Sequence, residues 1–162
     1  MTRSRDDLIA AINFEVRRSQ NRTDAYDEAV AGAIGLNRTD QRCLDIIEQE
    51  GGATAGRLAE LMGLTTGAIT TVLDRLERAG LAQRVRDESD RRRVRVTMTE
   101  KAHQELWPFY EPLLKMSERL YSRYTDEELA LLLRFLEDAA ELHEGVFAEL
   151  RARLQAGASS TV

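Results

Sequence analysis

Cysteine and proline are scarce in this 162-residue sequence, which contains one cysteine, Cys43, and two prolines. A single cysteine cannot form an intrachain disulfide, so a disulfide-stapled secreted domain is excluded and a reducing cytoplasm is the expected location. No apolar run approaches the roughly 20 residues that a membrane-spanning helix needs. Residues 1–19 also lack the unbroken apolar centre of a secretion signal. These absences predict a cytoplasmic protein with no membrane partner.

Sequence motifs of catalysis and metal binding are missing as well. There is no glycine-rich phosphate loop and no Ser/His/Asp or Cys/His pairing in a recognisable context, so we expect neither an enzyme nor a cofactor. A zinc sensor would have to combine the distant His103 and His143 with Cys43, and no ligand spacing indicates such a metal site. Cys43 lies beside Leu44 in a predicted helix, which favours a buried structural role over redox sensing.

The composition is that of a globular protein, with 43% hydrophobic residues, 31% charged residues and a net charge of −5. The length predicts a single domain over residues 1–162 that can bury a proper core. The small and polar residues 156–162 predict a disordered tail.

The segment from Thr54 to Thr99 has the most specific pattern in the chain. Two short amphipathic helices are predicted, and between them Gly63 is typical of a helix end and Thr65 of an N-cap. Apolar residues recur at three- and four-residue spacing in the second helix and predict its buried face: Ile69, Val72, Leu73 and Leu76. A basic hairpin is predicted next, which completes the layout of a winged helix-turn-helix, a DNA-reading module.

The opposite face of the second helix carries small, hydrogen-bonding or cationic side chains, which can approach base edges and phosphates. We predict that Thr70 and Thr71 contact base edges or the nearby backbone in the major groove. Thr66 is expected near a phosphate at the helix N-terminus, and Arg75 is expected to contact a phosphate.

The predicted hairpin consists of two strands of alternating character joined by the charged loop 87–93. In the return strand Val94, Val96 and Met98 share one face. Residues 82–97 contain six arginines against three acids, a local charge of +3 in an acidic chain. Residues 53–54 are predicted to add a very short third strand.

Three spaced motifs closely resemble the MarR family of bacterial transcription regulators. They are LDRLERAGL at 73–81, DESDRRR at 87–93 and TMTEK at 97–101. The chain departs from the family pattern at Glu88, where proline is usual, at Met98, where leucine is usual, and at residues 102–103, where a glycine is frequent. None of these departures affects the arginines of the wing.

The resemblance implies a mainly α fold with a small antiparallel β-hairpin: a winged helix-turn-helix over 37–99, with dimerisation helices at 5–34 and 100–154. It also implies that Arg92 enters the minor groove while Asp90 orients the loop, with Arg91 and Arg93 near phosphates or in pairs within the wing. A narrow minor groove concentrates negative potential, which favours an inserted guanidinium. The predicted DNA-binding residues are Thr65, Thr66, Gly67, Thr70, Thr71, Arg75, Asp90, Arg91, Arg92 and Arg93.

Apolar stripes in the first and last helices exceed what one small domain needs. Leu8, Ile9 and Ile12 begin the first stripe, and the residues from Leu129 to Leu150 form a second, coiled-coil-like seam. Two-fold dimers place two recognition helices one DNA turn apart, and the family resemblance implies such a dimer on a palindromic operator. The alternative is that the Leu129–Leu150 seam packs only within its own chain.

Four side chains are candidates for an effector pocket that binds a small aromatic molecule: Phe14, His103, Trp107 and Tyr110. Plain core packing is the competing interpretation.

Taken together, the sequence predicts a homodimeric, sequence-specific DNA-binding repressor that a small ligand releases. The rival hypothesis is a winged-helix protein-interaction module without DNA binding, which the net acidity favours. Residues 125–154 contain eight acids and three arginines, so the acidity is segregated from the basic wing.

Overall fold

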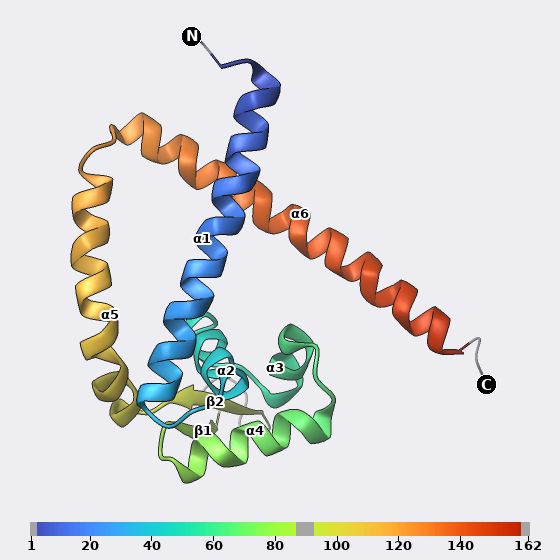
Figure 1. The fold of residues 1–162 in the computed structure, drawn as a ribbon. Helices are drawn as coiled ribbons and strands as arrows, with labels where there is room; N and C mark the ends of the chain where they lie inside the picture. The colour runs from blue at the N-terminus through green and yellow to red at the C-terminus, as the bar shows by residue number, and fades with distance from the viewer. Residues whose placement is uncertain (1–2, 87–92, 160–162) are drawn as a thin grey trace. The chain divides into compact units, whose positions relative to one another are not determined.

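The computed structural model describes residues 3–86 and 93–159, which form a mainly helical fold with one antiparallel hairpin, as the sequence predicted. The elements are α1 (Arg5–Ala33), α2 (Arg38–Gln49), α3 (Ala55–Met62), α4 (Thr66–Arg78), β1 (Ala82–Arg86), β2 (Val94–Met98), α5 (Glu100–Tyr121) and α6 (Asp126–Ser159) (Figure 1). The chain divides into two compact units, residues 1–111 and 112–162. None of the described helices is both long and apolar enough to cross a membrane.

The core of the first unit is formed where α2, α3 and α4 pack against the hairpin (Figure 1). Leu44 of α2, Leu58 of α3 and Leu73 of α4 are fully buried at its centre. The predicted inner face of α4 is confirmed, because Ile69, Val72, Leu73 and Leu76 are all at most 3% exposed. Burial of these side chains holds α4 in place, since each aliphatic side chain removed from water contributes about 1.5–3 kcal/mol.

Local capping sets the turn between α3 and α4. Gly63 ends α3 in the left-handed conformation with φ 67°, and the Thr65 side chain accepts a hydrogen bond from the Ala68 amide at 3.3 Å. At the far end of α4 the amide of Leu81 donates to the Leu76 carbonyl at 2.9 Å, and Gly80 has φ 73°. This is a Schellman stop, and it directs the chain into β1.

The hairpin pairs Ala82 with Met98 and Arg84 with Val96. The predicted third strand is a single bridge between Ala53 and Val96. The Ala53 amide donates to the Val96 carbonyl at 3.1 Å, and the Val96 amide donates to the Ala53 carbonyl at 2.7 Å. Gly52 precedes this bridge with φ 95°, and a Cβ there would lie 2.9 Å from Thr97 Cγ2. Only glycine therefore fits this turn, which ties the base of the wing to the end of α2.

In the second unit, α6 begins with a capping box. The Thr125 amide donates to Glu128 Oε2 at 2.8 Å and the Thr125 hydroxyl accepts from the Glu128 amide at 3.3 Å. Residues 156–159, where the sequence predicts a disordered tail, continue α6, which ends at Ser159. The alanines of this segment favour helix and its single glycine costs only about 1 kcal/mol. Residues 160–162 lie outside the described residues.

Both prolines of the chain, Pro108 and Pro112, lie inside one long helix, where proline favours a kink or a short break. No break is present, since α5 is helical from Glu100 to Tyr121. Each proline removes only one amide donor, and Pro108 is exposed, where water can solvate the freed carbonyl. In α1, the side chains that begin the predicted apolar stripe, Leu8, Ile9 and Ile12, are each 46% exposed.

Candidate nucleic-acid interface

The outer face of α4 presents two threonines whose hydroxyl protons are already engaged. Thr70 Oγ1 donates to the Thr66 carbonyl at 2.8 Å, and Thr71 Oγ1 donates to the Gly67 carbonyl at 3.1 Å. Both residues are exposed. With the proton committed to the backbone, each side chain offers an acceptor lone pair and a methyl group to the solvent. Those groups suit the exocyclic amines of adenine or cytosine and the methyl group of thymine.

The N-terminus of α4 is exposed at Thr66 and Gly67. The Thr65 cap satisfies the Ala68 amide, and the first amides of any helix have no partner within the helix. Free amides and the positive end of the helix dipole favour an anion at this position. The geometry is suitable for a phosphate beside the threonine face.

Arg75, predicted to contact a phosphate, forms an ion pair with Asp40 of α2. Its Nε donates to both carboxylate oxygens at 3.1 and 3.2 Å, and its Nη2 donates to Oδ1 at 2.5 Å. The Asp40 side chain is 4% exposed while that of Arg75 is 37% exposed. The hydrogen bonds to Asp40 raise the pKa of Arg75 further above its usual value. Arg75 therefore joins α4 to α2, and its exposed edge keeps donors for an outside acceptor.

Two arginines of the hairpin are used within the protein. Arg84 lies opposite Val96 and pairs with Glu77 and, at 3.3 Å, with Asp74, both on α4. Arg95 donates from Nη2 to the Gly51 carbonyl at 3.1 Å and also to the Gly52 carbonyl. These contacts fix the angle between the wing and the recognition helix. Arg93 is exposed, whereas the predicted contacts Asp90, Arg91 and Arg92 lie outside the described residues.

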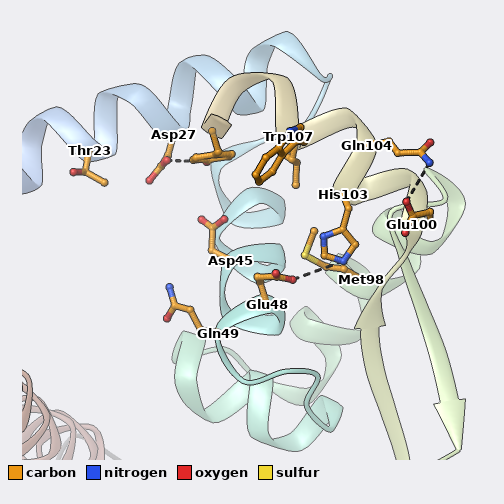
Figure 2. Close-up of a pocket in the computed structure, with 12 residues that line it drawn as sticks. Thr23, Asp27, Asp45, Glu48, Gln49, Met98, Glu100, His103, Gln104 and Trp107 are labelled. Atoms are coloured by element: carbon orange, nitrogen blue, oxygen red, sulfur yellow. Dashed lines mark hydrogen bonds and ion pairs between the residues drawn. The ribbon is translucent and has the colours of Figure 1, made fainter. Parts of the chain in front are cut away.

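A cavity of about 750 Å³ lies between α1, α2, the first part of α5 and the end of β2, and all of its lining residues belong to the first unit. Three of the four candidate pocket residues, His103, Trp107 and Tyr110, line it. Figure 2 shows His103 and Trp107 on α5 facing Asp45 and Glu48 on α2. Phe14 does not line the cavity, which corrects its assignment. It precedes Thr23, the first lining residue of α1, by about 13 Å of helix, and it is 64% exposed.

A hydrogen-bonded network closes one side of this cavity. The Tyr110 hydroxyl donates to Asp27 Oδ1 at 2.9 Å, and Gln41 Nε2 donates to the Tyr110 hydroxyl at 3.2 Å and to Asp45 Oδ1 at 3.1 Å. Burial raises the pKa of Asp45 to about 6, and the nearby Asp27 carboxylate adds to the shift. Burial and the bond to Asp27 raise the pKa of Tyr110 as well. The cavity therefore contains one carboxylate, that of Asp45, whose charged form is disfavoured by its surroundings.

The structure also bears on the redox and metal alternatives. Cys43 is fully buried, as predicted, and burial raises the pKa of its thiol to about 12. A thiol in this environment is a poor nucleophile, which argues against redox sensing. Among the described residues, no group of three or more histidine, cysteine, aspartate or glutamate side chains could hold a metal ion.

Sequence reasoning missed the contacts that join distant segments. The Asp40–Arg75 pair spans 35 residues and the Tyr110–Asp27 bond spans 83. No spacing rule connects such positions. The only available signal was an acidic residue at the start of α2, which is equally well explained by the helix dipole.

A tight helix-turn-helix whose second helix is exposed on a polar face, followed by a two-stranded wing, defines the class of winged helix-turn-helix DNA-binding proteins. Comparisons with known proteins agree. The sequence profile of the MarR family matches residues 36–94. An uncharacterized HTH-type transcriptional regulator of Bacillus subtilis, YcgE, is 36% identical over 141 residues, which cover 87% of this chain and 92% of YcgE.

Solved structures share the fold. A MarR family protein from Bacillus stearothermophilus aligns with a TM-score of 0.61 at 24% identity, covering 89% of this chain and 99% of that one. FabT of Streptococcus pneumoniae, solved in complex with DNA, aligns with a TM-score of 0.62 at 24% identity, covering 85% and 99%. The chain belongs to the MarR family, and it is a DNA-binding transcription regulator rather than an enzyme.

Proposed function

We propose that this protein is a homodimeric, sequence-specific repressor that acts on a palindromic operator in the bacterial cytoplasm and is released by a small-molecule effector. The observation that carries the proposal is the exposed threonine face of α4, held rigidly by a buried apolar face and by the Asp40–Arg75 pair. A rigid reading helix with small hydrogen-bonding side chains is what sequence-specific contact in the major groove requires.

The dimer is supported by apolar side chains that the single chain leaves in water. In α1, Leu8, Ile9 and Ile12 are 46% exposed and Phe14 is 64% exposed. Exposed apolar side chains also run along α6, including Leu132, Leu136, Leu142, Val146 and Leu150, at 42–64%. None of the α6 side chains that the structure describes is buried. Monomeric proteins rarely leave such long apolar patches in water, so a second copy is the natural cover.

Thr70 and Thr71 are proposed to contact DNA bases through their free acceptor and methyl groups. The amides of Thr66 and Gly67 are proposed to contact the phosphate backbone of the DNA. Thr65 serves as the cap that orders those amides. In the wing, Arg92 is proposed to enter the minor groove, with Asp90 orienting the loop and Arg91 and Arg93 near phosphates. These roles follow from the family resemblance of the loop 87–93.

Release by a ligand is assigned to the cavity lined by His103, Trp107 and Tyr110. One wall of the cavity is α2, whose Gln41 donates a hydrogen bond to Tyr110. The residue before Gln41 is Asp40, which forms the ion pair with Arg75 of α4. A ligand that displaces α2 would therefore disturb α4 through a direct ion pair. In this proposal the Asp40–Arg75 ion pair links the ligand cavity to the DNA-contacting face of α4, and regulation by a ligand requires such a coupling between two sites.

The test is a fluorescence-anisotropy titration of the protein against DNA from its own upstream region at three salt concentrations. Wild type should bind one palindromic site as a dimer, and Arg92→Ala should weaken binding severely with little change in melting temperature. The salt dependence should flatten by a slope of about 0.9 for each phosphate interaction that the substitution removes. Arg153→Ala, on exposed α6 outside the winged part, is the matched control and should behave as wild type.

Two outcomes would count against the proposal. A stable monomer in sedimentation at micromolar concentration would remove the dimer. Equal operator affinity for wild type and Arg92→Ala at all three salts would mean that the wing does not read DNA, and the interaction-module hypothesis would take its place.

A further inference from the structure

The cavity between α1, α2 and α5 has a strongly one-sided charge. Four carboxylates line it, from Asp27 on α1, Asp45 and Glu48 on α2, and Glu100 on α5. Neither lysine nor arginine is found among its described lining residues, and His103 is the one basic side chain there. Figure 2 shows Asp27, Asp45 and Glu48 on the walls of the same space. An anionic ligand would meet repulsion from at least three directions.

The four carboxylates differ in the partners that they already have within the protein. Glu100 accepts a hydrogen bond from Gln104 at 3.2 Å, and Glu48 lies 3.9 Å from His103 Nε2. Asp27 and Asp45 face each other across the Tyr110–Gln41 network, and the donors they receive there are the neutral Tyr110 hydroxyl and the neutral Gln41 amide. Two partly buried carboxylates with neutral donors lower their energy when a cation binds between them.

The rest of the wall is apolar and aromatic. Trp107, Leu106 and Met98 join the ring of Tyr110 in lining the cavity. A volume of about 750 Å³ is in the range of drug-sized ligands, far more than a single ion needs. Aromatic faces attract organic cations as well as apolar groups. Because the described carboxylates do not form a cluster that could hold a metal ion, a bare divalent cation fits this site poorly.

We propose that this cavity binds an organic cation, an amine or quaternary ammonium carried on an apolar or aromatic body, with the charged nitrogen between Asp27 and Asp45. The body of the ligand packs on Trp107 and Leu106. The assignment of this ligand as the effector rests on the proposed function, while the binding itself does not. The raised pKa of Asp45 agrees with this picture, because a bound cation would stabilise the charged carboxylate that burial and Asp27 disfavour.

The test compares three probes that share one ring system and differ in charge: naphthylethylamine, naphthylethanol and naphthylacetate. Binding to the full-length protein is measured by calorimetry near neutral pH in the absence of DNA. The ammonium should bind about tenfold more tightly than the alcohol, and the carboxylate should bind most weakly. Asp45→Asn and Asp27→Asn should each reduce ammonium affinity about tenfold and leave alcohol affinity within about twofold.

Both variants keep the oxygen that accepts from Gln41 or Tyr110, so the fold should be retained, and melting curves check this. Asp138→Asn, on α6 and outside the cavity lining, is the matched control and should bind all three probes as wild type does. An ammonium that binds no more tightly than the alcohol overturns the proposal. So does an ammonium affinity that neither cavity variant reduces.

A second titration separates this proposal from the regulatory function. Operator DNA is added to the protein with and without saturating naphthylethylamine, and the cation should weaken operator binding. If the cation binds as expected while the operator does not bind at all, the proposed function fails and the cavity assignment stands. If the operator binds normally and the ammonium shows no preference over the alcohol, the cavity assignment fails and the DNA-binding function stands.

Discussion

Replacing Arg75 with glutamine should remove the only charged partner that the described part of the chain provides for the buried carboxylate of Asp40. The Asp40 side chain is 4% exposed, and besides Arg75 it accepts one bond from Asn37 Nδ2 at 2.8 Å. Breaking a buried ion pair by removing one partner costs about 3–5 kcal/mol. Arg75 is 37% exposed and its attraction is partly screened by water, so we expect a decrease of about 2–3 kcal/mol in unfolding free energy.

Replacing the other partner of the ion pair should lower the unfolding free energy by less. Asp40→Asn leaves no buried charge, and Arg75 can turn its guanidinium to the solvent, so about 1 kcal/mol is expected. The double variant should resemble Asp40→Asn alone, because the glutamine then faces a neutral amide. For a protein of this size, 1 kcal/mol corresponds to about 2–4 °C, so Arg75→Gln should lower the melting temperature by about 5–10 °C.

The assay is thermal unfolding followed by circular dichroism at one fixed protomer concentration, since the proposed dimerisation would make the midpoint depend on concentration. Anisotropy titrations at 25 °C then separate the two roles of Arg75. If Arg75 also contacts a phosphate, Arg75→Gln should weaken binding to all sequences, whereas Asp40→Asn should preserve it. A melting temperature for Arg75→Gln within about 2 °C of wild type, or a larger destabilisation by Asp40→Asn, would refute the reasoning.

Further outcomes can be checked with the same preparations. Thr70→Val removes the acceptor but keeps the methyl group, so it should change sequence preference by about 1–3 kcal/mol at one position per half-site in a selection from an operator library. Because the pKa of Asp45 is about 6 in the fold against a usual value of 3.8, folded Asp45 retains its proton longer, and its contribution to stability falls as pH rises from about 4 to 6. Asp45→Asn should therefore stabilise the protein by about 1 kcal/mol at neutral pH, after discounting for partial exposure, and the gain should vanish near pH 4 in melting curves. Gly52→Ala should cost about 2 kcal/mol in urea unfolding, and a neutral result would contradict the close contact with Thr97. The Cys43 thiol should react with dithiobis-nitrobenzoate only after denaturation, and a fast reaction of the native protein would contradict its burial.

The helix-turn-helix was predictable from sequence because its determinants are local. Thr65 and Thr125 cap their helices through residues three positions away, and Gly63 and Gly80 end helices through their own left-handed φ. The buried face of α4 follows from the three- and four-residue spacing of its apolar side chains. Each of these features depends on interactions within about one turn of helix, so a single sequence is enough to identify it.

Hairpin alternation was a weaker guide. It correctly placed β1 and β2, but it did not reveal that Arg84 lies opposite the buried Val96 and reaches Asp74 and Glu77 on α4. Which face a strand residue shares with its partner depends on the register, and a one-residue difference in register reverses the faces. The count of six arginines in this segment therefore overstated the number available to DNA.

The sequence by itself determined the class of fold, the family and the position of the helix-turn-helix, because capping, helical periodicity and the wing motif are short-range patterns. The tertiary structure decided which charges are paired within the chain. It joined Arg75 to Asp40, gathered Asp27 and Asp45 into one acidic cavity and excluded Phe14 from that cavity. These outcomes depend on how helices far apart in the chain pack, and no local rule encodes that geometry. The apolar faces of α1 and α6 combine both kinds of information, since their pattern is local in sequence, whereas a cover for them would come from the proposed second copy of the chain.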